Sequence, residues 1–103
     1  AFKDYSDYNS ISAEDGEAAL DMIRMNNPDM VLIDMMMPRI GGLALLIDIK
    51  KTKETKNIPV ILMSGVMKHK TLQKEGLELG ATAYFTKPLD VNKLLEKIKS
   101  ILN

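Results

Sequence analysis

The chain has 103 residues, of which 46% are hydrophobic and 27% charged, and its 14 basic side chains balance 14 acidic ones. This length suits one domain spanning residues 1–103, and the balanced charge argues against general nucleic-acid binding, which normally uses a basic excess. The absence of cysteine excludes disulfides and thiolate sites, and no apolar run approaches the ~18 residues that span a membrane, so we expect a cytoplasmic protein.

Strand-like and helix-like segments alternate four times along the chain. A short polar strand is predicted first, followed by a helix that Asp15 caps and Asn26-Asn27-Pro28 ends. The second strand is a continuous apolar run, typical of strands covered on both faces, and Gly41-Gly42 opens the next helix. The third helix stops at Gly80, and Asp90 caps the last helix. The predicted strands are 8–12, 30–33, 58–63 and 82–86, and the third helix covers about 68–79.

Apolar residues at helical spacing give the helices inward faces. The residues expected to face the core are Ala19, Leu20 and Ile23 in the first helix, Leu43, Leu46 and Ile47 in the second, and a stripe of Val91, Leu94, Leu95, Ile98, Ile101 and Leu102 in the last.

Alternating strands and helices with short connections predict an α/β fold, in which a parallel sheet carries helices on both faces. Ligands and chemistry in such sheets collect at the carboxyl ends of the strands. Asp34, Ser64 and Lys87 each follow directly after one of the predicted strands. If those strands are neighbours, the three side chains converge on one small surface.

A carboxylate, a hydroxyl and an ammonium group make a poor hydrolase triad, because no general base is present to activate the serine. They suit a phosphoryl group carried on the carboxylate, with Asp34 as the nucleophile and with Lys87 and Ser64 contacting the phosphate oxygens. Taken singly, each residue has an ordinary explanation as a turn former or a solvated side chain. The joint pattern is what favours chemistry.

Three motifs lie at these strand ends in a consistent order: IDMMMPRIGG from Ile33, VILMSG from Val60 and GATAYFTKP from Gly80. In content, order and spacing they resemble the receiver domain of two-component response regulators. The resemblance runs from about Tyr8 to Leu102. It implies a flavodoxin-like parallel sheet flanked by helices, and a signalling module rather than an enzyme with turnover.

The resemblance gives each matching residue a role. Asp34 would accept a phosphoryl group from a histidine kinase or a phosphotransfer protein, and Lys87 would contact the resulting acyl phosphate. Ser64 would move toward a phosphate oxygen, and Tyr84 would swing inward with it, although Tyr84 alone reads equally well as a plain strand aromatic. The bond between Lys87 and Pro88 is typically cis in the family.

The methionines after the acceptor have implied roles as well. Met35 to Met37 are expected to form a flexible apolar loop over Asp34. The resemblance implies that the backbone carbonyl of Met36 and the carboxylate of Asp34 bind Mg²⁺. The Met36 thioether neither carries charge nor binds water well, so the phosphate should be lost slowly.

The family's first strand, which ends in an acidic pair that binds the magnesium, has no match in this sequence. Residues 1–7 resemble only the tail of the helix that follows that strand. Phosphorylation of the chain as it stands should therefore be weak or absent. Because the missing strand is central in the family's sheet, we expect one of three situations: an omitted N-terminal segment, a rearranged sheet, or strand exchange with a second copy.

The sequence thus predicts a phosphorelay receiver module in which phosphorylation of Asp34 shifts a partner-binding surface around the last strand and its flanking helices. The alternative is a non-phosphorylated module used for protein interaction or dimerisation, for which self-association would be expected. Whether the acidic pair exists in the natural protein discriminates between the two.

Overall fold

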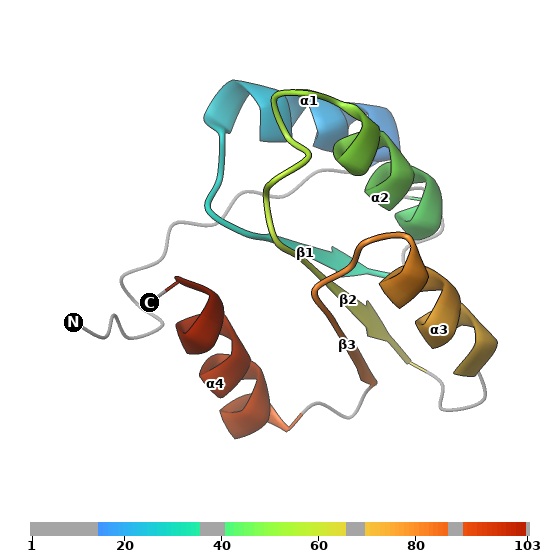
Figure 1. Cartoon of the computed structure of the whole chain (residues 1–103), viewed down its shortest axis with the longest axis vertical. Coiled ribbons are helices and arrows are strands. Elements are labelled where there is room, and N and C mark those ends of the chain that lie inside the picture. Colours follow the sequence, from blue (N-terminus) through green and yellow to red (C-terminus); the bar gives the residue numbers. More distant parts are fainter. Residues whose placement is uncertain (1–14, 36–40, 66–69, 87–89, 103) are drawn as a thin grey trace.

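A computed structural model of the chain describes residues 15–35, 41–65, 70–86 and 90–102. Within them, helices and strands alternate as the sequence predicts (Figure 1). The elements are α1 (Gly16–Asn26), β1 (Val31–Asp34), α2 (Gly42–Lys51), β2 (Val60–Ser64), α3 (Lys70–Glu78), β3 (Ala83–Thr86) and α4 (Val91–Leu102). None of the helices in these residues is long and apolar enough to cross a membrane.

The three described strands form a parallel sheet in the order β1-β2-β3. Asp34 lies opposite Met63 of β2, and Ser64 lies opposite Thr86 of β3. The strands are sequential neighbours joined by helices, which is the α/β arrangement predicted from the alternation of elements. The predicted strand at 8–12 lies outside the described residues.

Strand ends differ from the sequence prediction by one or two residues. β1 and β2 each extend far enough to include Asp34 and Ser64 as their last residues. β2 begins after Pro59, because proline has no N–H for a sheet hydrogen bond; the carbonyl of Pro59 instead accepts from the N–H of Val31 at 2.9 Å. Asp34 and Ser64 are therefore held by strand backbone.

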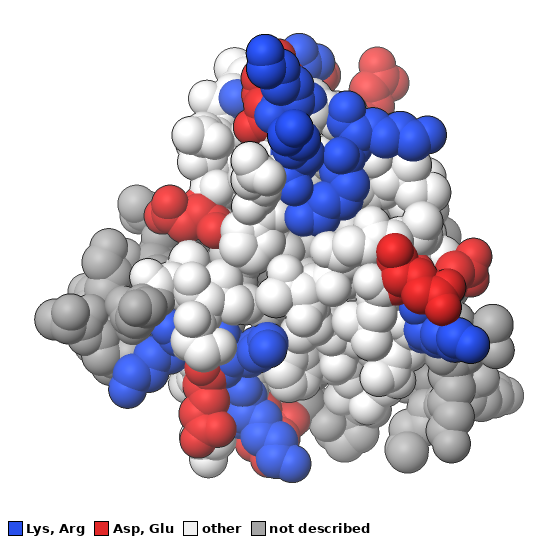
Figure 2. Space-filling view, viewed as in Figure 1, with Lys and Arg blue, Asp and Glu red and all other residues white. Residues whose placement is uncertain are grey.

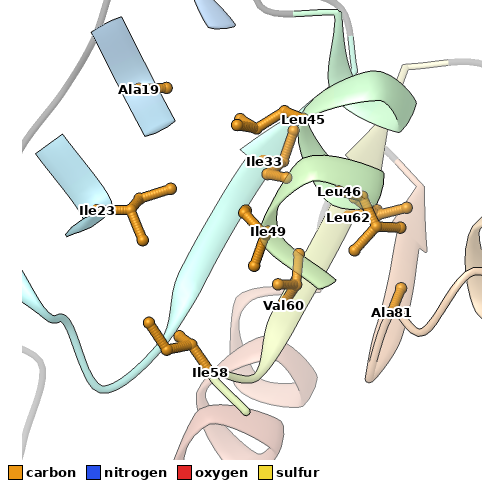
Figure 3. Close-up of a cluster of buried hydrophobic side chains, with 10 residues drawn as sticks. All are labelled: Ala19, Ile23, Ile33, Leu45, Leu46, Ile49, Ile58, Val60, Leu62 and Ala81. Atoms are coloured by element: carbon orange, nitrogen blue, oxygen red, sulfur yellow. The ribbon is translucent and has the colours of Figure 1, made fainter. Parts of the chain in front are cut away.

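Helices cover both faces of the sheet: α1, α2 and α3 lie on one side and α4 on the other (Figure 1). Strand side chains alternate between the two faces, so β2 and β3 each contribute to two cores, whereas Leu32 on the second face of β1 is 42% exposed. The larger core joins β1 and β2 to α1 and α2 (Figure 3). The smaller one joins Ile61 of β2 to Leu94 and Ile98 of α4, with Ala83 and Phe85 of β3 packed against it.

The inward face of α2 was only partly predicted. Leu46 is fully buried as expected, but its buried apolar neighbours are Leu45 and Ile49, while Leu43 and Ile47 are half-buried. The reason is that α2 packs against both the sheet and the neighbouring helix α1, so its buried face is rotated from the one that the sequence spacing suggested.

In α4, the prediction that Val91 joins the apolar stripe is wrong: Val91 is 60% exposed, at the first position of the helix. Leu94 and Ile98 are buried as predicted, and Ile101 and Leu102 pack against the same core.

The predicted helix ends are largely confirmed. The Asp15 carboxylate accepts a hydrogen bond from the N–H of Ala18 at 2.8 Å, which caps α1. Asn27 adopts a left-handed conformation with φ of 46° and ends the same helix. Gly80, with φ of 110°, follows α3, which ends at Glu78. The N–H of Lys93 donates to the carboxylate of Asp90 at 3.2 Å at the start of α4.

The loop from α2 to β2 is held by two side chains. The Lys50 ammonium donates to the carbonyl of Ile58 at 2.9 Å and to that of Lys56 at 3.2 Å. The buried Thr55 hydroxyl donates to the carbonyl of Ile49 at 2.7 Å. Burial lowers the pKa of Lys50 below its usual 10.5. Lys and Arg side chains gather around this end of the molecule (Figure 2).

Candidate functional site

The candidate site lies at the carboxyl edge of the sheet, where Asp34 ends β1. Asp34 is partly buried, and the residue before it, Ile33, is 3% exposed in the larger core. The backbone N–H of Met35 donates to the carbonyl of Met63 at 2.7 Å, so the sheet hydrogen bonds continue one residue past the aspartate. This anchors a carboxylate on rigid backbone at the edge where α/β sheets bind ligands.

Ser64 ends the neighbouring strand, one residue further along than the position opposite Asp34. It is 1% exposed, and with Thr55 it is one of two buried polar residues in the described part of the chain. The parallel register thus brings the predicted acceptor and the predicted hydroxyl to the same edge on adjacent strands. A hydroxyl there can donate to an oxygen of a group carried by the carboxylate.

Tyr84 lies inside β3, three residues before Lys87, and is paired with Leu62 of β2. Its ring packs against the larger core and its hydroxyl is buried. That hydroxyl makes no hydrogen bond in the structure, although a buried polar group left unpaired costs about 1–3 kcal/mol. Tyr84 is therefore turned into the protein, in an arrangement whose hydrogen bonding is incomplete.

The remaining predicted site residues, Met36, Lys87 and Pro88, lie outside the described residues. Their roles, including the cis bond between Lys87 and Pro88, stay predictions. Of the predicted site residues, the structure places Asp34 and Ser64 at the carboxyl ends of adjacent strands and packs Tyr84 against the larger core.

One structural feature at this edge was not predicted. Met35 was expected to belong to a flexible loop, but its side chain packs against the larger core. A Cβ atom on Gly42 would overlap the Met35 sulfur and lie 3.3 Å from Cγ2 of Ile33. Gly41 precedes it with φ of 59°, in the left-handed region that favours glycine. The Gly41-Gly42 pair was the available sequence signal, read only as a helix start.

The described residues do not form a magnesium site by themselves. They contain no group of three His, Cys, Asp or Glu side chains that could hold a metal ion. Magnesium takes near-octahedral oxygen coordination, and Asp34 is the predicted carboxylate ligand among the described residues. Receiver domains, which the sequence motifs resemble, generally bind Mg²⁺ at the phosphorylation site.

Comparison with known proteins identifies this arrangement. The family model for the response regulator receiver domain matches residues 1–99. The receiver domain of NtrX from Brucella abortus superimposes with a TM-score of 0.81 over 94% of this chain and 82% of that one, at 29% identity. A putative response regulator from Chloroflexus aurantiacus gives a TM-score of 0.79 over 87% of this chain and 73% of that one, at 31% identity.

Relatives found by sequence are of several kinds. The polar-differentiation response regulator DivK of Brucella ovis is 34% identical over 94% of this chain and 78% of its own length. Histidine kinase P4 of Formosa agariphila is 38% identical over 93% of this chain, which spans 7% of that protein. The chain therefore corresponds to one module of its longer relatives. By sequence and by fold, this chain belongs to the response regulator receiver domain family.

Proposed function

We propose that this chain is a phosphoacceptor module, phosphorylated on Asp34 by a histidine kinase or a histidine phosphotransfer protein. Receiver domains are signalling modules that interact with such proteins. The observation that carries the assignment to Asp34 is its place as the last residue of a parallel strand, directly after the buried Ile33 and beside a strand that ends in a buried serine.

The chemistry is a transfer between two carriers. A carboxylate oxygen of Asp34 attacks the phosphorus of a phosphohistidine, forming an O–P bond while the N–P bond breaks. The departing imidazole keeps the electron pair of that bond and takes up a proton. A carboxylate nucleophile carries no proton, so the attack needs no general base. Ser64 and Lys87 contact the oxygens of the transferred group.

Tyr84 couples the site to a surface. Ser64 and Tyr84 lie on adjacent strands, and Tyr84 packs against the larger core with an unpaired hydroxyl. Movement of Ser64 toward the phosphoryl group changes the packing around Tyr84. This shifts the equilibrium between an unphosphorylated and a phosphorylated conformation of the region. The partner-binding surface that responds lies around β3 and the helices α3 and α4.

The second candidate function is a non-phosphorylated module for protein interaction or dimerisation. The lack of a cluster of acidic metal ligands in the described residues favours it. Leu32 adds to this: it lies in the middle of β1 but is 42% exposed, and such a side chain can be covered by a partner.

Incubation with a small acyl-phosphate donor and magnesium separates the two functions. The test uses this chain and the same chain preceded by a receiver-type strand ending in an acidic pair, and intact mass is measured. We expect one added phosphoryl group, weakly in the first protein and strongly in the second, and none in Asp34→Asn of either. No incorporation in the extended protein overturns the phosphoacceptor function and favours the interaction module.

A further inference from the structure

We propose that Met35 and Gly42 form a packing contact that positions the acceptor, so that the seat of the Met35 thioether on Gly42 sets the reactivity of Asp34. The proposal rests on the phosphoacceptor function above and names residues 35 and 42 as positioning residues for it. We call this contact the Met35–Gly42 seat. Neither residue contacts the reacting atoms in the mechanism just described.

The first support is the missing side chain of Gly42. Gly42 is buried at the first position of α2. A Cβ placed there would overlap Sδ of Met35 and stand 3.2 Å from its Cε and 3.3 Å from Cγ2 of Ile33. Because real Cβ atoms do not tolerate an overlap of this kind, an alanine at position 42 requires the end of the Met35 side chain to move from the place where it now packs.

The second support is the position of Met35 in the chain. It follows Asp34 directly, and its N–H is bonded to the carbonyl of Met63 at 2.7 Å. Its backbone is thereby tied to β2 while its side chain is tied to the start of α2. Any displacement of the Met35 side chain acts on a residue one peptide bond away from the acceptor.

The third support is that the seat links the end of a strand to the start of the next helix. Residues 36–40 connect Met35 to Gly41, and Gly41 starts α2 by accepting a hydrogen bond from the N–H of Leu45 at 2.9 Å. The seat therefore joins the residue that follows β1 to the first residue of α2. A positional error of about 1 Å at a reacting group can lower a rate by about 10²-fold, so a contact at this place has a kinetic consequence.

The test is a double-variant cycle of Gly42→Ala, Met35→Ala and the two together. The amides of Asp34 and Met35 are followed by nitrogen-15 NMR. We expect Gly42→Ala to shift both signals, because the new methyl group expels the thioether. The double variant should lie nearer to Met35→Ala than the sum of the single changes predicts. If the amide shifts of the double variant equal the sum of the shifts in the two single variants, the Met35–Gly42 contact is overturned.

The second readout is the rate of phosphate incorporation, measured in whichever form of the protein incorporates it. We expect Gly42→Ala to slow incorporation by about tenfold or more, within the range open to misplaced catalytic groups. Met35→Ala in the Gly42→Ala background should recover part of that loss, and Met35→Leu alone should stay within about twofold of wild type, because leucine conserves most of the volume.

The matched control is Gly76→Ala in α3, whose added Cβ would meet Cδ1 of Leu62 at 2.6 Å. It introduces the same methyl group into a buried helix position away from the acceptor loop. We expect it to lower the urea midpoint as Gly42→Ala does, while the Asp34 amide shift and the incorporation rate stay close to wild type. Equal slowing by both variants overturns a positioning role and leaves a general packing effect.

The two proposals fail separately. If wild type incorporates no phosphate in any form, the phosphoacceptor function is overturned, and the NMR cycle still decides whether the seat holds Asp34 in place. If wild type incorporates phosphate and Gly42→Ala does so at the same rate, the seat is overturned as a control of reactivity while the function stands.

Discussion

At the scale of single residues, the buried hydroxyl of Tyr84 affects the stability of the fold. Its hydroxyl is buried without a hydrogen bond, whereas the hydroxyl of Thr55, also buried, donates to the carbonyl of Ile49. Both hydroxyl groups are buried, but only that of Thr55 has a hydrogen-bond partner. The first should oppose folding in this arrangement and the second should support it.

We therefore expect Tyr84→Phe to raise the free energy of unfolding by about 1 kcal/mol, because the substitution removes an unpaired buried polar group. Thr55→Val is the control with the opposite sign and should lower it by about 1 kcal/mol, because the Ile49 carbonyl loses its donor. Urea denaturation measures both. A loss of stability in Tyr84→Phe would contradict the unpaired state of the hydroxyl.

The lowered pKa of Lys50 predicts how the stability of the protein depends on pH. Burial lowers its pKa in the folded state below 10.5, so between those two pKa values the unfolded chain binds more protons than the folded one. The contribution of Lys50 to stability therefore rises with pH through that interval. Below the lowered pKa, both states are protonated and the folded state carries the full desolvation penalty.

Lys50→Met should be less stable than wild type by about 1 kcal/mol at neutral pH, because the carbonyls of Lys56 and Ile58 lose a donor. The difference should widen as pH approaches 10.5, since the variant lacks the titrating group. Urea titrations at several pH values check this. Lys51→Met, at an exposed neighbouring position, is the control and should change the free energy of unfolding at neutral pH by less than about 0.5 kcal/mol. A difference that narrows with rising pH would contradict the account.

At the scale of elements, the helices show what sequence spacing resolves. The prediction for the apolar stripe of α4 is right for Leu94, Ile98 and the last two residues, which pack on one face of the sheet, and wrong for Val91, which is 60% exposed. The buried face of α2 was predicted less well, because that helix contacts the sheet and α1 at once, and its buried arc depends on a neighbour distant in sequence. The spacing of apolar residues identifies the buried face of a helix, and the packing of neighbouring elements determines how many residues that face includes.

Helix α4 offers a matched pair of substitutions, one at a buried position and one at an exposed position. Ile98→Ala should cost about 2–5 kcal/mol, since Ile98 is 5% exposed and its removal leaves a cavity against Ile61. Val91→Ala, at a position 60% exposed, should change the free energy of unfolding by less than about 0.5 kcal/mol. Thermal or urea unfolding compares them. Similar losses in the two variants would mean that α4 does not pack as described.

At the scale of the whole molecule, the sequence located the site through topology. Asp34 and Ser64 could be predicted because apolar strands followed by polar residues mark the carboxyl edge of a parallel sheet, and the observed register places both at that edge. The Met35–Gly42 seat could not be predicted, because a close contact between a strand end and a helix start depends on how far apart the two elements settle. Met36, Lys87 and Pro88 remain predictions from motifs.

The central claim, that the aspartate at the end of β1 carries the phosphoryl group, is tested most directly by locating the label. The extended protein, phosphorylated by the acyl-phosphate donor, is reduced with borohydride, which converts an aspartyl phosphate to homoserine, and its peptides are then sequenced by mass spectrometry. We expect homoserine at position 34 and at no other acidic residue. Homoserine elsewhere, with Asp34 unchanged, would contradict the account.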